Sequence, residues 1–358
     1  LPKEERESIR IMQKAFDLGV NYIDTAPYYM DSQSEILVGK ALKGYRDKVY
    51  LATKNPIEDS SGESFRKRLE KSLGQLAVDY IDFYYFWSIN LDVYQEKINL
   101  PKGPLEAAFK AKEEGLIKHL CFSVHDIREN VIKLIDEGVF EAVLCQYNLL
   151  DREHEATFAY AKAKGLGTAV MGPIAGGRLG APSPILQQLL PDGVKSNAET
   201  AFRFVFANPH VDVVLSGMGS LQMVEENVVT ASREEQLSQG EILRLGEIME
   251  EKRKLADLYC TGCDYCLPCP AGVNIPENFR YMNNYRIYGL EDYAREEYRL
   301  LGQEGHWVEG KSAKDCVKCG ECEKKCPQKI KIMERLQEVD AVLGKPTEQK
   351  IQVDWYPR

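Results

Sequence analysis

Residues 4–232 alternate short apolar runs with amphipathic segments, and this alternation constrains the fold more than any other feature of the chain. The apolar runs are nearly continuous and rich in β-branched and aromatic residues, which is typical of strands buried in a parallel sheet. The segments between them place apolar residues three and four positions apart, as helices do. We predict strands at 20–26, 48–54, 80–87, 117–124, 141–148, 166–171 and 211–217. We predict helices at 5–17, 62–76, 102–115, 128–137, 153–164, 197–207 and 221–231.

Strand–helix alternation over this length predicts an α/β fold, a (β/α)8 TIM-type barrel. One strand of the eight is lacking and the chain opens on a helix, so we expect strand 1 to precede Leu1. The rival architecture is an open doubly wound sheet, which needs no missing strand. No Gly-x-Gly-x-x-Gly motif follows an early strand, and this favours the barrel.

Eight of the ten cysteines lie in two short runs, CTGCDYCLPCP at 260–270 and CVKCGECEKKCP at 316–327. The second run has the spacing of bacterial ferredoxins, in which three thiolates on one loop bind three irons of a cubane. The fourth iron needs a thiolate from elsewhere. In ferredoxins with two clusters, the cysteine before proline in each run binds the other cluster.

The two runs therefore predict two 4Fe-4S clusters in a small α-helical, ferredoxin-like domain. One cluster would take Cys260, Cys263, Cys266 and Cys326, and the other would take Cys316, Cys319, Cys322 and Cys269. Only two residues separate Cys266 from Cys269, one fewer than in the ferredoxin pattern, so the role of Cys269 stays open.

Zinc and disulfides are the alternatives for these cysteines. Zinc sites with four cysteines normally use two short pairs and a longer spacer, so zinc is disfavoured. Without a signal-peptide pattern, we expect a cytoplasmic protein, in which disulfides are rare. Cys121 and Cys145 lie in apolar stretches, and we expect them to be buried small hydrophobic residues.

The composition is that of a globular protein, with 44% hydrophobic and 28% charged residues among 358. A formal net charge of −9 without an evident basic stripe argues against nucleic acid, and no apolar stretch is long enough to span a membrane. Lys324 and Lys325 look like an isolated, solvated pair. We predict four segments: a barrel at 1–232, a linking helix at 233–255, the iron–sulfur domain at 256–340 and an extended tail at 341–358.

The stretch between the cysteine runs, residues 275–301, is rich in tyrosine and predicted to be helical. Its aromatic side chains either help to cover the clusters or form an ordinary small core.

Seven segments of the barrel resemble the aldo-keto reductase family, and the appended cysteine runs resemble the branch with a C-terminal ferredoxin-like domain. The matching segments, in order, are NYIDTAPYY (21–29), YLATK (50–54), DYIDFYYFW (79–87), CFSVHD (121–126), QYNLLDRE (146–153), VMGPIAGGRL (170–179) and SGMGSLQMVEEN (216–227). The resemblance implies an oxidoreductase that uses a nicotinamide cofactor.

The family's catalytic tetrad is Asp, Tyr, Lys and His, and the resemblance places three of the four at Asp24, Tyr29 and Lys54, with Tyr28 as the alternative tyrosine. A tyrosine is a poor acid at neutral pH, and a lysine cation beside it stabilises the phenolate and eases proton donation. The aspartate would keep the lysine charged and oriented. Trp87 occupies the histidine position, and an indole cannot titrate. Three alternatives follow: Trp87 stacks on a large flat substrate, the barrel has lost catalysis, or His125, which follows the predicted strand 117–124, takes the place of the histidine.

The resemblance also implies a nicotinamide site that departs from the family pattern. Ser123 and Gln146 match positions that hold the carboxamide, Glu226 and Asn227 match adenine contacts, and Met171 stands where a stacking aromatic is usual. The glycine-rich loop that begins at Gly172 would admit phosphates. Gly217 and Met223 replace the lysine and arginine that select NADP. Without these cations to pair with a 2′-phosphate, we expect NAD(H), with NADH preferred over NADPH.

We therefore predict an iron–sulfur oxidoreductase of the aldo-keto reductase type, acting on a small carbonyl-like substrate with NAD(P)H, with cluster-delivered electrons, or with both. Hydride carries two electrons and a cluster carries one, so a flavin or a substrate that tolerates a radical would have to split the pair. The clusters would exchange electrons with an external carrier, such as a ferredoxin or flavoprotein. The alternative is an electron-transfer subunit or binding module whose barrel is inactive.

Overall fold

A computed structural model describes most of the chain, and it divides into two compact units. The barrel unit comprises residues 1–175 and 201–237, and the helical unit comprises 176–200 and 238–356. The described residues are 4–175, 177–180, 194, 196–234, 236–257, 260, 266–304, 306, 308–326 and 329–346.

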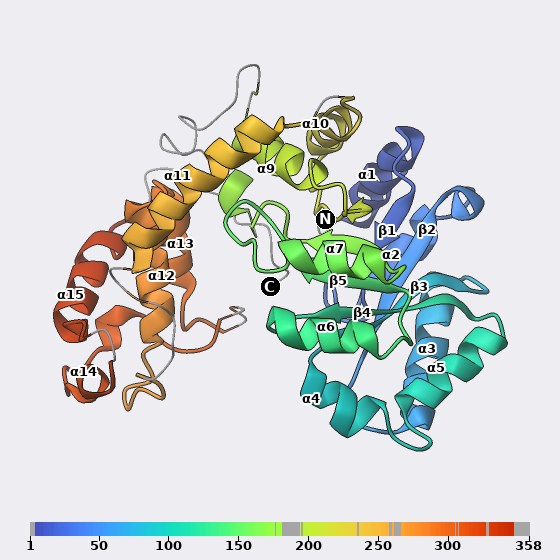
Figure 1. The fold of residues 1–358 in the computed structure, drawn as a ribbon, viewed down its shortest axis with the longest axis horizontal. Coiled ribbons are helices and arrows are strands. Elements are labelled where there is room, and N and C mark those ends of the chain that lie inside the picture. The colour runs from blue at the N-terminus through green and yellow to red at the C-terminus, as the bar shows by residue number, and fades with distance from the viewer. Residues whose placement is uncertain are drawn as a thin grey trace. The chain divides into compact units, whose positions relative to one another are not determined.

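Seven parallel strands build the barrel unit in the order β1 to β7, each bonded to the next along the chain (Figure 1). They are β1 Tyr22–Asp24, β2 Tyr50–Pro56, β3 Ile81–Ile89, β4 Ile117–Val124, β5 Ala142–Gln146, β6 Gly167–Met171 and β7 Val213–Val214. Each falls on a predicted strand. Side chains from all seven strands, including Tyr22, Ala52, Tyr85 and Cys121, pack in one cluster. A single interior shared by every strand means that the sheet curls into a nearly closed TIM-type barrel, as predicted.

Helices follow the strands in the alternation that the sequence predicts. They are α1 Glu5–Asp17, α2 Ser34–Ala41, α3 Gly62–Leu76, α5 Pro104–Glu113, α6 Arg128–Asp136, α7 Glu155–Ala163, α9 Asn197–Phe206 and α10 Leu221–Ala231, with the short α4 Leu91–Val93 and a π-turn at Tyr94–Ile98. The periodicity did not indicate α2, because this helix is short and buries residues around most of its circumference. Cys121 and Cys145 are fully buried in the barrel unit, as expected of small hydrophobic residues.

The helical unit contains α11 Gln239–Asp257, α12 Ile275–Arg286, α13 Glu291–Leu300, α14 Glu321–Lys325 and α15 Ile332–Leu343. The predicted linking helix begins at Gln239 rather than at residue 233. Ser238 and Glu241 exchange side-chain-to-backbone hydrogen bonds, so they form a capping box that fixes this start. The predicted helical stretch 275–301 is two helices, because Gly289 has a φ of 63° and turns the chain between them.

The aromatic residues of α12 and α13 form the core of the helical unit. Phe279, Tyr281 and Tyr298 are buried there, and six of the cysteines from the two runs pack against this core. The structure therefore supports both interpretations of the tyrosine-rich stretch. Part of the predicted tail belongs to α15, whose buried Leu343 ends the helix, and residues 347–358 lie outside the described part of the chain.

Two polar side chains hold the segment that leads into the second cysteine run. Asn278 is fully buried; its Oδ1 accepts from the Ala313 amide at 2.8 Å and its Nδ2 donates to the Lys311 carbonyl at 3.1 Å. The Tyr298 hydroxyl accepts from the Lys314 amide and donates to Asp340. The loop of cluster cysteines thus starts from a fixed backbone. In the described part of the chain, no helix is both long enough and apolar enough to cross a bilayer.

Candidate active site and cluster loops

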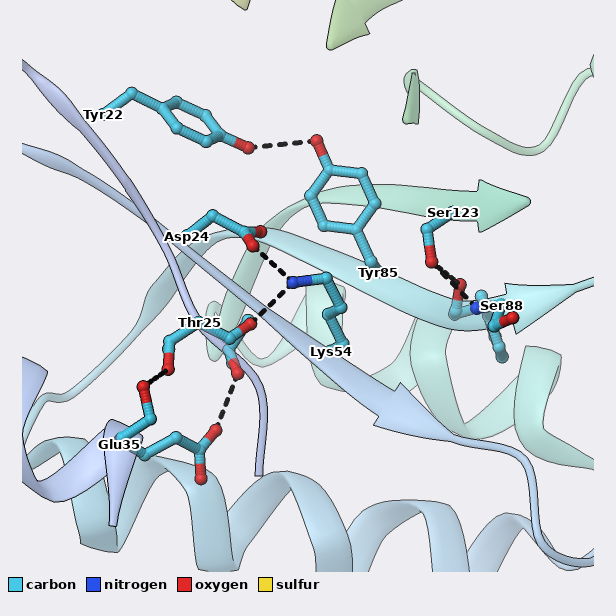
Figure 2. Close-up of polar contacts among 11 residues, drawn as sticks. Tyr22, Asp24, Thr25, Glu35, Lys54, Tyr85, Ser88 and Ser123 are labelled. Atoms are coloured by element: carbon cyan, nitrogen blue, oxygen red, sulfur yellow. Dashed lines mark hydrogen bonds and ion pairs between the residues drawn. The ribbon is translucent and has the colours of Figure 1, made fainter. Parts of the chain in front are cut away.

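A buried ion pair joins the ends of the first two strands. Asp24 is the last residue of β1, and Lys54 lies in β2 two positions beyond Ala52, the partner of Asp24. Lys54 Nζ donates to Asp24 Oδ2 at 2.5 Å and to the Thr25 carbonyl at 2.8 Å (Figure 2). The Lys54 side chain is 3% exposed and that of Asp24 12%. The structure thus brings together two of the predicted catalytic residues.

The electrostatic surroundings keep Lys54 charged. Burial alone would lower its pKa, but the carboxylate of Asp24 and the phenol of Tyr29 outweigh burial, so the pKa of Lys54 lies above its ordinary value. Lys54 is therefore a cation throughout the neutral range. Its Nζ lies 4.8 Å from the centre of the Tyr29 ring.

The two adjacent tyrosines have opposite surroundings. Tyr29 faces the Lys54 cation, whereas the Tyr28 hydroxyl donates a hydrogen bond to Glu58. This hydrogen bond raises the pKa of Tyr28, because the neighbouring carboxylate opposes formation of a phenolate. Tyr28 is therefore held by a carboxylate that opposes loss of its proton, and the geometry favours Tyr29, beside the Lys54 cation, as the proton donor. The resemblance also selected Tyr29 and kept Tyr28 as the alternative, and no local signal in the sequence pointed to Glu58.

Trp87 lies between the two tyrosines. Its ring meets Tyr29 edge-to-face at 5.6 Å between ring centres and meets Tyr28 at 5.7 Å in a tilted arrangement. It belongs to β3, and the register of β3 with β4 shifts between Phe86 and Ile89. The shift is a β-bulge, a feature that redirects side chains next to functional sites.

Ser123 fixes the bulge beside Trp87. Ser88 has a φ of 52°, unusual for a residue with a side chain, and its amide donates to Ser123 Oγ at 2.8 Å (Figure 2). Ser123 is buried near the end of β4. The sequence assigned Ser123 to the nicotinamide carboxamide, and the structure adds this contact, which the sequence did not indicate.

A second layer of polar contacts lies behind the ion pair. The Thr25 and Ser34 hydroxyls are 2.8 Å apart, and Thr53 Oγ1 donates to Glu35 Oε1 at 2.6 Å (Figure 2). Glu35 is 1% exposed, and burial raises its pKa. The first turn of α2 therefore contacts the residues next to Asp24 and Lys54 in both strands. Sequence analysis missed this layer because α2 was not predicted.

The remaining predicted cofactor residues lie at the carboxyl ends of β5 to β7 and on α10. Gln146, the last residue of β5, donates to Asp151 at 2.7 Å, and it lies beside Gly172, whose φ is 64°. Asn227 on α10 donates to Ser216 Oγ at 3.1 Å. Met171 ends β6, Gly217 follows β7, and Glu226 and Met223 are exposed on α10. These residues occupy the end of the barrel at which Asp24 also lies, where TIM barrels place their sites.

Four of the predicted cluster ligands line one pocket in the helical unit. Its wall contains Cys269, Cys316, Cys319 and Cys322 together with apolar side chains of Ile275, Val317, Met333 and Leu336. Lys318 and Gly320 have positive φ values of 56° and 77°, so the backbone of the loop turns sharply and its cysteines line the same pocket. These are the four thiols predicted for the second cluster, which supports a ligand role for Cys269.

Among the described residues, the thiols of this pocket are not gathered around one point. Thiolates bind zinc at about 2.3 Å and crowd around it. Among the residues that the structure describes, no three histidine, cysteine or acidic side chains converge that closely. Cys260, Cys266 and Cys326, predicted for the first cluster, all pack against the core of the helical unit. Cys263 lies outside the described residues.

Comparisons with known proteins agree with this division of the chain. The aldo/keto reductase family matches residues 1–250, and the 4Fe-4S dicluster domain matches residues 259–331. L-galactose dehydrogenase of Arabidopsis thaliana is 30% identical over 262 residues, 66% of this chain and 81% of that protein.

Solved structures give the same result. The holo form of the aldo-keto reductase AKR11C1 from Bacillus halodurans has a TM-score of 0.62 at 28% identity, covering 69% of this chain and 88% of that one. An aldo/keto reductase from Klebsiella pneumoniae, solved with NADP and acetate, is similar in fold (TM-score 0.58, 23% identity, 68% and 86% coverage). The chain belongs to the aldo/keto reductase family, and it carries a C-terminal 4Fe-4S dicluster domain. It is an iron–sulfur oxidoreductase of the aldo/keto reductase type.

Proposed function

We propose that the barrel reduces a flat, carbonyl-containing small molecule, with Tyr29 as the proton donor. The observation that carries this proposal is the placement of the Tyr29 ring 4.8 Å from the Nζ of a buried lysine that Asp24 holds at 2.5 Å. A reduced nicotinamide, when bound, supplies hydride to the carbonyl carbon. The protein's own task is to orient the carbonyl and to protonate its oxygen as negative charge develops there.

Each residue of the site has a distinct task in this proposal. Tyr29 donates its hydroxyl proton to the carbonyl oxygen, and the Lys54 cation stabilises the phenolate that remains. Asp24 keeps Lys54 charged and directed toward Tyr29. Tyr28, the alternative tyrosine, donates a hydrogen bond from its hydroxyl to Glu58, and this carboxylate raises the pKa of Tyr28.

Trp87 gives the site its preference for flat substrates. Its indole cannot exchange a proton as the family histidine would, but it presents an aromatic surface beside Tyr28 and Tyr29. Tyr28 is 50% exposed and Tyr29 39%, so this aromatic group is open to a ligand. A planar aromatic carbonyl compound would stack on it.

The predicted cofactor is NAD(H), bound by Ser123, Gln146, Met171, Gly172, Gly217, Glu226 and Asn227. Gly217 and the exposed Met223 offer no positive charge to a 2′-phosphate. We expect NADH to bind more tightly than NADPH in a fluorescence titration. Much tighter binding of NADPH would refute this preference.

The helical unit is proposed to hold two 4Fe-4S clusters. Cys316, Cys319, Cys322 and Cys269 share one pocket and would bind one cluster; Cys260, Cys263, Cys266 and Cys326 would bind the other. Such clusters exchange single electrons with an external carrier. Anaerobic purification should yield about eight irons per chain with visible absorbance. Colourless protein containing zinc would contradict the assignment.

The two tyrosines provide a matched test of the catalytic proposal. Tyr29→Phe should lower the kcat for NADH-dependent reduction of a panel of aromatic aldehydes by roughly 100-fold or more, since the proton donor is lost. Tyr28→Phe removes the same atom from the neighbouring residue and should retain most of the activity.

Trp87 in place of the family histidine favours a second candidate, an electron-transfer subunit whose barrel only binds a ligand. If wild-type protein reduces none of the aldehydes, and its clusters accept electrons equally well in both tyrosine variants, this second function would replace the first.

A further inference from the structure

The segment that carries the second cysteine run is strongly basic in an acidic protein. Residues 311–331 contain seven lysines and three acidic residues, whereas the whole chain has a formal net charge of −9. All seven lysines are exposed. We call them the basic rim: Lys311, Lys314, Lys318, Lys324, Lys325, Lys329 and Lys331. Lys324 and Lys325, which looked isolated in the sequence, are part of this larger group.

In the part of the chain that the structure describes, most of the rim lysines have no acidic partner. Lys324 pairs with Glu321 at 2.6 Å, and Lys331 lies 4.0 Å from Glu334. Among the described residues, the other five rim lysines form no ion pair within 4.0 Å. Their charge therefore faces solvent, where it can act on an approaching molecule.

Several of the rim lysines lie at or near the pocket proposed for the second cluster. Lys318 is itself part of the pocket wall, between Val317 and Cys319. Lys314 lies two residues before Cys316, and α14 carries the pair Lys324 and Lys325 between two cluster cysteines. Neighbouring Cα atoms are about 3.8 Å apart, so each of these lysines has its Cα within roughly 12 Å of a cysteine Cα.

An apolar group and a thiol are exposed on either side of the rim lysine Lys318. Val317 is 68% exposed, and Cys319 is the exposed cysteine among the four that line the pocket. An apolar centre within a charged border is the arrangement of protein–protein interfaces. The other three cysteines are only partly exposed, so an electron would enter from the side of Cys319.

We propose that the basic rim docks a small acidic protein that carries one electron, with Val317 at the centre of the contact. This inference rests on the proposed function, in which the clusters exchange electrons. In one encounter the reduced carrier loses one electron and the cluster held by the four cysteines gains it; no bond forms or breaks and no proton moves. Opposite charges steer the partners together and set the orientation for transfer.

The test compares two triple variants of the cluster-loaded full chain with the same net charge. Lys314→Gln, Lys318→Gln and Lys325→Gln together neutralise the rim. The matched control, Lys43→Gln, Lys110→Gln and Lys133→Gln, removes three exposed lysines from the barrel unit. The probe is a reduced acidic two-iron ferredoxin, and stopped-flow absorbance measures its association and electron transfer.

At low ionic strength the rim variant should associate about tenfold more slowly than wild type, and the control variant should be unaffected. The difference should vanish near 1 M salt, where the Debye length is about 3 Å. Val317→Ser should weaken binding of the ferredoxin without changing its salt dependence. The cluster reduction potentials should be the same in both triple variants.

Equal association rates for the two triple variants would overturn the proposal. A rate loss that persists at high salt, or that follows a changed reduction potential, would show that the lysines tune the cluster instead. Aldehyde reduction by the same preparations, measured with NADH, reports on the proposed function independently of docking.

Discussion

Removal of one partner of the Asp24–Lys54 pair should destabilise the barrel far more than removal of both. Lys54→Met leaves the Asp24 carboxylate without its cation, and Asp24 Oδ1 is already buried without a hydrogen-bond partner. Asp24→Asn leaves Lys54, whose side chain is 3% exposed, with the Thr25 carbonyl as an acceptor but without a negative charge beside it. Each single variant should therefore lose about 3–5 kcal/mol of unfolding free energy, the usual cost of an uncompensated buried charge.

The double variant carries no buried charge and should lose only about 2 kcal/mol, mostly from the unpaired amide of the new asparagine. Urea unfolding of the four proteins, followed by circular dichroism, gives the free energies for the cycle. A loss in the double variant equal to the sum of the two single losses would refute the idea that Asp24 and Lys54 act as one unit.

Two further predictions concern the layer around the ion pair. Ser123→Ala removes the acceptor of the Ser88 amide, so the free energy of unfolding should fall by about 1 kcal/mol and the fluorescence emission of Trp87 should shift. Ser123→Thr keeps the acceptor and serves as the control. Unchanged emission in Ser123→Ala would contradict control of the bulge by this serine. Burial raises the pKa of Glu35, so the folded protein holds this proton more tightly than the unfolded chain does. The stabilisation from this group is therefore fully present below the ordinary pKa of 4.5 and is lost as the pH rises through the raised pKa. Glu35→Gln should abolish that decline of unfolding free energy with pH, and a variant with the wild-type slope would show that Glu35 is not its source.

The barrel could be predicted well because the sequence features that indicate its strands and helices are local. Continuous apolar runs and helical spacing are properties of neighbouring residues, and parallel strands bring their carboxyl ends to one edge. Asp24 and Lys54 could thus be placed together before any contact was known. The cysteine spacing likewise encodes a loop whose thiols converge, and the pocket contains the set expected for one cluster.

Long-range contacts are what the sequence could not supply. Glu58 distinguishes Tyr28 from Tyr29 although it lies about thirty positions away, and Ser123 fixes a bulge in another strand. The charge of the basic rim can be counted in the sequence, but its meaning depends on exposure around a pocket. Helix α2 was missed because it is buried on most sides, so its pattern carries no amphipathic period.

The central claim is that hydride passes from NADH to a carbonyl carbon whose oxygen Tyr29 protonates. Transfer of an isotope from NADH to the product tests this claim most directly. NADH deuterated at the transferring position should give, with an aromatic aldehyde, an alcohol that carries one deuterium on the former carbonyl carbon, as detected by mass spectrometry. Product formed without deuterium would contradict the account, because the electrons would then have reached the carbonyl by way of the clusters.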